Sequence, residues 1–155
     1  MDNKEKILGR GFKALRPESE YADDVIAPPY DVLNSEEARA LAEGKPFSFL
    51  HISKPEIGLP KDISVDDPLV YKRGLENLES MIQKNILIRD DEESLFVYNI
   101  ATKHHSQTGI AFVASIDAYD NNLIKKHEHT KPAKELDRIN NIKALNAQTG
   151  PVLLT

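Results

Sequence analysis

Apolar residues recur along this chain with a period near 3.6 in some segments, which favours helix, and near two in others, which favours strand. The clearest helical segment is 68–84. Asp67 precedes it as an N-cap, and Pro68 occupies its first position, where the missing N–H of proline costs nothing. The apolar stripe expected on this helix consists of Tyr71, Leu75, Leu78 and Ile82.

Two further helices are predicted from their boundaries. The first covers residues 34–43: Asn34 and Glu37 have the spacing of a capping box, and Gly44 supplies a left-handed stop. The second covers residues 132–147. Its apolar face would hold Leu136, Ile139 and Ile142. Its opposite face would hold Lys134, Asp137, Arg138 and Asn141.

Strand patterns follow the 68–84 helix. Segments 86–89, 95–102 and 110–116 are separated by polar turns, which is typical of an antiparallel meander. Alternation also predicts a buried strand over 47–53, and a long proline-containing loop follows it. We therefore predict an α+β fold, with a mostly antiparallel sheet containing a three-stranded meander and about three helices.

Composition narrows the class of protein. A chain of 155 residues, 40% apolar and 29% charged, is typical of one globular domain. Cysteine is absent, which excludes disulfides and cysteine-ligated metals and fits a cytoplasmic protein. No apolar run is long enough to span a membrane. The net charge of −5 argues against general nucleic-acid binding.

The last residues, 152–155, read as the start of an apolar strand. We therefore expect residues 1–155 to be a single domain and the N-terminal part of a longer protein. The C-terminal half of the same chain would then be one partner. An apolar edge left uncovered would favour self-association, for instance as a homodimer.

A basic segment at 125–138 is the strongest candidate for chemistry. It holds five Lys or Arg, three Asp or Glu and two His, and it enters the 132–147 helix. Backbone N–H groups at a helix start favour anions, and lysine and arginine add charge, so this segment suits a phosphate group. The alternative is a solvated, charge-rich loop and helix face.

The same segment contains other candidate groups. His127 and His129 could share a metal, but the neighbouring lysines argue against a bound cation. Glu128 could act as a general base, whereas Glu135 is more simply explained by ion pairing along the helix. Elsewhere, Asp31 follows a stiff Pro-Pro-Tyr segment and is either an acid–base group or a turn-forming residue.

Common enzyme motifs are absent from this sequence, including the phosphate-binding P-loop, the dinucleotide-binding glycine pattern, the serine nucleophile elbow and the protein-kinase signatures.

Five segments, however, share their order with one protein family. They are Phe12-Lys13-Ala14-Leu15-Arg16-Pro17, Ala27-Pro28-Pro29-Tyr30-Asp31-Val32, Ser48-Phe49-Leu50-His51 with Lys54-Pro55-Glu56, Lys126-His127-Glu128-His129-Thr130 with Lys134-Glu135-Leu136-Asp137-Arg138, and Asn146-Ala147-Gln148-Thr149-Gly150-Pro151. On these segments the chain resembles the bacterial family catalogued as domain of unknown function 1015.

That family is in turn similar to free-serine kinases of the ParB–sulfiredoxin superfamily. The resemblance implies an ATP-dependent kinase, with Mg²⁺, that phosphorylates a hydroxyl substrate such as free L-serine. In such a site Lys126, Thr130, Lys134 and Arg138 would bind the phosphates or nucleotide. The catalytic group would comprise Asp31, His127, Glu128 and His129, with no dedicated metal site.

Members of the family carry an Asp-Gly-His-His-Arg motif in their later half, and this chain contains none. We therefore expect little kinase activity from residues 1–155 alone. The other hypothesis is a non-catalytic module that binds a nucleotide or a phosphorylated metabolite, and a weaker one is a domain that only supports the rest of the protein.

Overall fold

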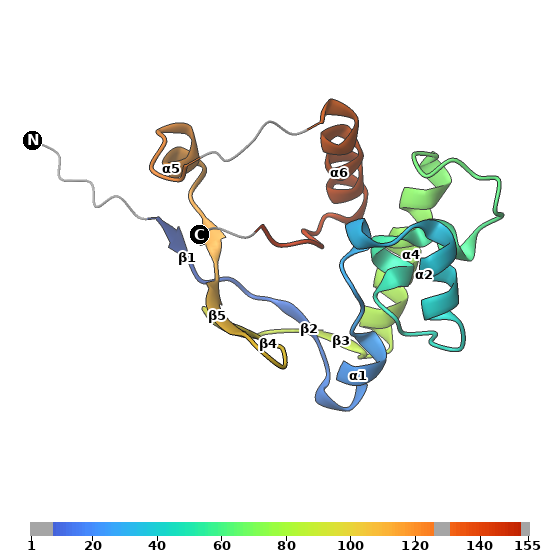
Figure 1. Ribbon diagram of the computed structural model, residues 1–155, viewed down its shortest axis with the longest axis horizontal. Coiled ribbons are helices and arrows are strands. Elements are labelled where there is room, and N and C mark those ends of the chain that lie inside the picture. The colour runs from blue at the N-terminus through green and yellow to red at the C-terminus, as the bar shows by residue number, and fades with distance from the viewer. Residues whose placement is uncertain (1–7, 126–130, 153–155) are drawn as a thin grey trace, which may run out of the picture. The chain divides into compact units, whose positions relative to one another are not determined.

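The computed structural model describes residues 8–125 and 131–152. Its chain folds into two compact units, which are described separately. The first contains residues up to Leu15 and those from Arg89 to His129, and the second contains residues 16–88 and 130–155. The fold is α+β, as the sequence predicts. Figure 1 shows the elements along the chain.

The second unit is mostly helical. Its elements are the 3₁₀ helices η1 (Ser19–Tyr21), η2 (Tyr30–Val32) and η3 (Pro55–Gly58), and the α-helices α1 (Ala22–Val25), α2 (Ser35–Ala42), α3 (Leu50–Ser53), α4 (Pro68–Gln83) and α6 (Pro132–Leu145). Helix α4 packs against α3, η3 and α6, and α2 packs against η3. One buried cluster joins α2 to α3 and η3 through Ala38, Ala42, Leu50 and Ile57.

Caps predicted from the sequence begin two of these helices. Asn34 accepts a hydrogen bond from the backbone N–H of Glu37, and Glu37 accepts one from the N–H of Asn34, so the capping box is confirmed. Asp67 caps α4 by accepting from the N–H of Leu69. After α2, Gly44 adopts a φ of +71°, the left-handed conformation expected there.

A close approach fixes how α4 packs. At Gly74 a Cβ atom would lie 2.9 Å from the Cγ of Pro55 and 3.4 Å from a methyl group of Leu145. Only glycine therefore lets α4 touch both η3 and α6 at this point. The buried face of α4 consists of Val70, Gly74, Leu78 and Met81. Of the predicted stripe, Leu78 belongs to this buried face, whereas Ile82 is exposed. The buried face of α4 is therefore rotated about the helix axis from the predicted one.

The first unit contains short antiparallel pairs. Strand β4 (Phe96–Ala101) forms a hairpin with β5 (Ser106–Ala111), and β1 (Gly9–Arg10) pairs with β6 (Val113–Ala114). Helix α5 (Ile116–Asp120) follows and is capped by the hydroxyl of Ser115.

The predicted three-stranded meander is not formed in the described residues. Strand β3 (Leu87–Arg89) pairs with β2 (Leu15–Pro17) instead of β4, and the boundary between the two units falls within these two strands. The backbone of Asp90 donates to Ala14, and Phe12 and Ser94 form a bridge. The acidic segment after β3 therefore continues beside the N-terminal strand and closes no hairpin.

The predicted strand at 47–53 is a turn followed by α3. The apolar run in this segment is short, and such runs suit a buried helical turn as well as a strand. Two backbone N–H groups, those of Ile52 and Ser53, donate to the carbonyl of Phe49 and close this turn. The following segment, predicted as a loop, contains η3.

Candidate functional site

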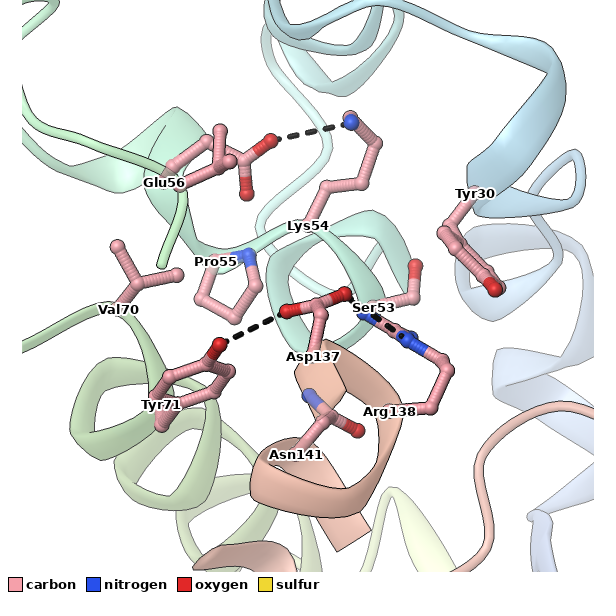
Figure 2. A pocket seen from close by; sticks show the side chains of 11 residues that line it. Tyr30, Ser53, Lys54, Pro55, Glu56, Val70, Tyr71, Asp137, Arg138 and Asn141 are labelled. Carbon is pink, nitrogen blue, oxygen red and sulfur yellow. Dashed lines mark hydrogen bonds and ion pairs between the residues drawn. The ribbon is translucent and has the colours of Figure 1, made fainter. Parts of the chain in front are cut away.

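A small pocket of about 110 Å³ lies in the second unit, where the segment α3–η3 meets α4 and α6 (Figure 2). Most of its polar lining comes from two short stretches, one at the α3–η3 junction and one in the second turn of α6. Its lining residues are Tyr30, Ser53, Lys54, Pro55, Glu56, Val65, Val70, Tyr71, Asp137, Arg138 and Asn141.

The first charged pair of the pocket joins Lys54 to Glu56. The ammonium Nζ lies 3.1 Å from Oε1 of the carboxylate, and the side chains are only 13% and 7% exposed. The hydroxyl of Ser35 donates to the same oxygen at 2.8 Å. Because a buried charge is costly without partners, Lys54 and Glu56 stabilise each other in this position, and Ser35 adds a hydrogen bond to the carboxylate.

Helix α2 also holds the backbone of this turn. The guanidinium of Arg39 donates to the carbonyls of Glu56 at 2.7 Å and Leu59 at 2.9 Å, and also to that of Ile57. Arg39 lies four residues after Ser35, so both project from one face of α2. One helical turn of α2 therefore fixes both the side chain of Glu56 and the turn that carries it.

The second charged pair joins two neighbours on α6. Nη2 of Arg138 lies 2.6 Å from Oδ2 of Asp137, and the side chains are 29% and 33% exposed. The other oxygen of Asp137 accepts a hydrogen bond from the hydroxyl of Tyr71 at 2.8 Å. The guanidinium of Arg138 lies 4.1 Å from the ring centroid of Tyr30, at cation–π distance. Figure 2 shows both contacts of Asp137.

Tyr71 has a perturbed acidity. Burial, followed by the hydrogen bond and the negative charge of Asp137, raises the pKa of the Tyr71 hydroxyl above its ordinary value. The phenol therefore stays protonated and donates its hydrogen bond throughout the neutral pH range. Tyr71 thus connects α4 to α6 at the pocket wall.

Two buried polar residues complete the lining. Asn141 on α6 is almost fully buried, and the hydroxyl of Thr149 lies 3.4 Å from its side-chain oxygen. Ser53 is 8% exposed, and its Oγ has no hydrogen-bond partner within the described part of the chain. Buried hydroxyls normally have a partner, so Ser53 stands out.

The charges of the pocket cancel. Lys54 and Arg138 each contribute one positive charge, and Glu56 and Asp137 each contribute one negative charge. Such a pocket offers donors and acceptors of both signs in a small volume. It is electrostatically suited to a dipolar ion, which carries both charges itself, more than to a simple anion.

Of the residues predicted from the sequence, the structure brings Arg138 to this pocket. Lys134 lies in the first turn of α6 and is exposed, and Asp31 lies in η2 and is exposed. Neither of these two lines the pocket. The remaining predicted residues, Lys126, His127, Glu128, His129 and Thr130, lie outside the described residues.

Sequence reasoning missed Lys54, Glu56 and Tyr71 as site residues. A signal for the first two was available, since a Lys-Pro-Glu sequence inside a long loop places two opposite charges around a stiff residue. Nothing in the local sequence of Tyr71 distinguishes it from a packing residue of the α4 stripe. Its partner Asp137 lies 66 residues away.

Across 8–125 and 131–152, no group of three or more His, Asp or Glu side chains is arranged to hold a metal ion. In the pocket itself, both oxygens of Asp137 and one oxygen of Glu56 already accept hydrogen bonds from the protein. Each of these carboxylates is therefore held in place by protein donors, and each keeps further lone pairs that a ligand could use.

None of the helices that the structure describes is long and apolar enough to cross a membrane.

Comparison with known families identifies the chain. It belongs to the family described as "Protein of unknown function (DUF1015)", whose profile matches residues 10–155. This confirms the family resemblance drawn from the five sequence segments. The search of curated proteins found no match, and neither did the search of solved structures.

Proposed function

We propose that this chain supplies the acceptor-binding part of an ATP-dependent kinase that phosphorylates a small hydroxyl substrate, with free L-serine as the acceptor. The observation that carries the proposal is the neutral pocket formed by two opposite-sign pairs, Lys54–Glu56 and Arg138–Asp137. L-Serine at neutral pH is a dipolar ion with one carboxylate and one ammonium group. Its charges complement those of the pocket.

The volume of the pocket supports an acceptor of this size. A cavity of about 150 Å³ holds benzene, a molecule similar in size to serine, so a pocket of about 110 Å³ is of the order that a small amino acid needs. Nucleotide and drug-sized ligands occupy pockets of roughly 300–1,000 Å³. The pocket alone therefore does not fit ATP, and we assign it to the acceptor.

The roles of the lining residues follow from their charges. Arg138 and Lys54 would bind the carboxylate of serine, and Asp137 and Glu56 would accept from its ammonium group. Held through both of its charged groups, the amino acid would present its hydroxyl in a fixed direction, and such positioning contributes to the reaction rate. ATP with Mg²⁺ supplies the phosphoryl group.

Calorimetric titration with L-serine tests the proposal. We expect binding by L-serine and much weaker binding by ethanolamine, which keeps the amine and the hydroxyl but lacks the carboxylate. Arg138→Met should reduce serine affinity roughly tenfold or more, because it removes a charged donor. Arg73→Met, which changes an arginine on the exposed face of α4, is the matched control. Equal affinity for the two ligands would reject an amino-acid site.

Turnover separates the kinase from the module that only binds. Protein incubated with L-serine, ATP and Mg²⁺ is expected to yield O-phosphoserine detectable by mass spectrometry when the protein also carries the Asp-Gly-His-His-Arg motif. Serine binding without phosphoserine in that protein would favour the non-catalytic regulatory module.

A further inference from the structure

The hydroxyl of Ser53 is the unusual polar group of this pocket. Within the described residues, its Oγ is the buried side-chain nitrogen or oxygen atom that lacks a hydrogen-bond partner. Ser48 provides a comparison five residues earlier, because it is buried too but its Oγ lies 3.4 Å from the backbone N–H of Leu50. Leaving a hydroxyl buried and unpaired destabilises a folded protein, so such a group calls for an explanation.

The local backbone explains why Ser53 has no internal partner. A serine in a helix can satisfy its hydroxyl by donating to the carbonyl four residues earlier. For Ser53 this is the carbonyl of Phe49, which already accepts from the N–H groups of Ile52 at 3.0 Å and Ser53 at 2.9 Å. Ser53 is one of the residues that line the pocket, and Figure 2 shows its side chain among those of the two charged pairs.

We propose that the Ser53 hydroxyl is a ligand-binding donor, which hydrogen-bonds to an oxyanion of the bound molecule and is satisfied only when the pocket is filled. This inference rests on the proposed function, in which the oxyanion is the carboxylate of L-serine. Lys54, the next residue, and Arg138 line the same pocket and supply the positive charge that draws an oxyanion into it. Both cations are already paired with carboxylates, and a neutral donor adds a bond without disturbing that balance.

If the Ser53 hydroxyl has this role, replacing it should weaken ligand binding without lowering the stability of the free protein. Ser53→Ala removes a hydroxyl that is unpaired in the free protein, so the midpoint of thermal unfolding should stay the same or rise. The same change removes one bond from the complex, so the dissociation constant for L-serine should rise about tenfold. Ser53→Cys, which keeps the size but donates weakly, should give an intermediate affinity.

Ser48→Ala is the matched control, since it removes a partnered buried hydroxyl outside the pocket. It should lower the unfolding midpoint and leave the affinity for L-serine unchanged. The experiment is calorimetric titration of the whole chain and its three variants with L-serine and with inorganic phosphate, together with thermal unfolding of each without ligand.

The outcomes separate this inference from the proposed function. Serine binding that is equal in the wild type and in Ser53→Ala overturns the donor role and leaves the acceptor site standing. Binding of phosphate but not serine, lost in Ser53→Ala, supports the donor role and overturns the proposed acceptor. A lower unfolding midpoint in Ser53→Ala, with unchanged affinity, would show that the hydroxyl has a structural partner such as an ordered water. Failure of the wild type to bind either probe overturns both.

Discussion

The Lys54–Glu56 and Asp137–Arg138 pairs line the same pocket but are held in different ways. The Lys54–Glu56 pair is nearly buried and depends on α2, whose Ser35 bonds to the Glu56 carboxylate. The Asp137–Arg138 pair is about one third exposed and joins adjacent residues of one helix. In the described part of the chain, Asp137 accepts a hydrogen bond from Tyr71, and Arg138 lies over the ring of Tyr30.

This difference separates two properties that a binding site needs. Burial makes the charges of the first pair interdependent, so breaking it leaves an uncompensated ion in a medium of low polarity. Partial exposure lets water screen the second pair, so its charges can exchange partners at lower cost. We infer that the first pair defines the shape of the pocket and that the second responds to the ligand.

The largest effect is expected from breaking the buried pair. Lys54→Met leaves the Glu56 carboxylate buried without its cation and should lower the free energy of unfolding by about 3–5 kcal/mol. Chemical denaturation measures this change. Lys61→Met is the control, because Lys61 pairs with Glu36 at the same distance of 3.1 Å on the exposed surface and should cost less than about 1 kcal/mol. Equal losses of stability in the two variants would show that burial of the Lys54–Glu56 pair does not increase its contribution.

The second largest effect is expected from releasing the backbone turn that carries Glu56. Arg39→Ala removes the guanidinium that bonds to three carbonyls around η3, and we expect a loss of about 2–4 kcal/mol, since the bonds share one donor group and are not additive. Serine affinity should also fall, because the turn carrying Lys54 and Glu56 loosens. Arg73→Ala serves as control. A variant that loses stability and keeps full affinity would show that α2 does not shape the pocket.

A smaller effect is expected at the exposed pair. Tyr71→Phe removes one hydrogen bond to Asp137 while keeping the ring, and should lower the free energy of unfolding by about 1 kcal/mol. Tyr98→Phe, on the exposed β4 strand, should change stability by much less. If Tyr71→Phe costs as much as Lys54→Met, the second pair is as tightly coupled as the first.

The smallest effect appears only at alkaline pH. Because the folded protein raises the pKa of Tyr71, it holds the phenolic proton more tightly than the unfolded chain does. The resulting stabilisation is fully present below the unfolded tyrosine pKa of about 10 and is lost as the pH rises through the higher folded value. Unfolding measured from pH 8 to 11 should therefore show a steeper loss of stability in the wild type than in Tyr71→Phe. Parallel curves would refute the assigned shift.

Helix α6 shows where prediction from periodicity stopped working. Its predicted apolar face, Leu136, Ile139 and Ile142, is exposed, whereas Asn141 and Leu145 are buried. Asp137 and Arg138, expected on the polar face, are half-buried at the pocket. Amphipathic patterns assume that the buried face is apolar. A helix that turns polar residues into a site violates this assumption, so the error coincides with the candidate function.

Local chemistry along the sequence determined where several helices begin and end. The Asn34 capping box, the Asp67 cap and the positive φ of Gly44 all follow from residues within a few positions of each other. The family, too, was recognisable from short segments in order. Caps and helix stops depend on residues that are close together in the chain, so they can be predicted directly from the sequence.

Only the tertiary structure decided which strands pair and which side chains form the pocket. The bond from Ser35 to Glu56 joins residues 21 apart, and that from Tyr71 to Asp137 joins residues 66 apart. The charge neutrality of the pocket and the unpaired Ser53 hydroxyl likewise arise only where the α3–η3 segment, α4 and α6 meet. Burial and pairing depend on the whole packed unit, because the free energy of a charge is set by everything that replaces water around it.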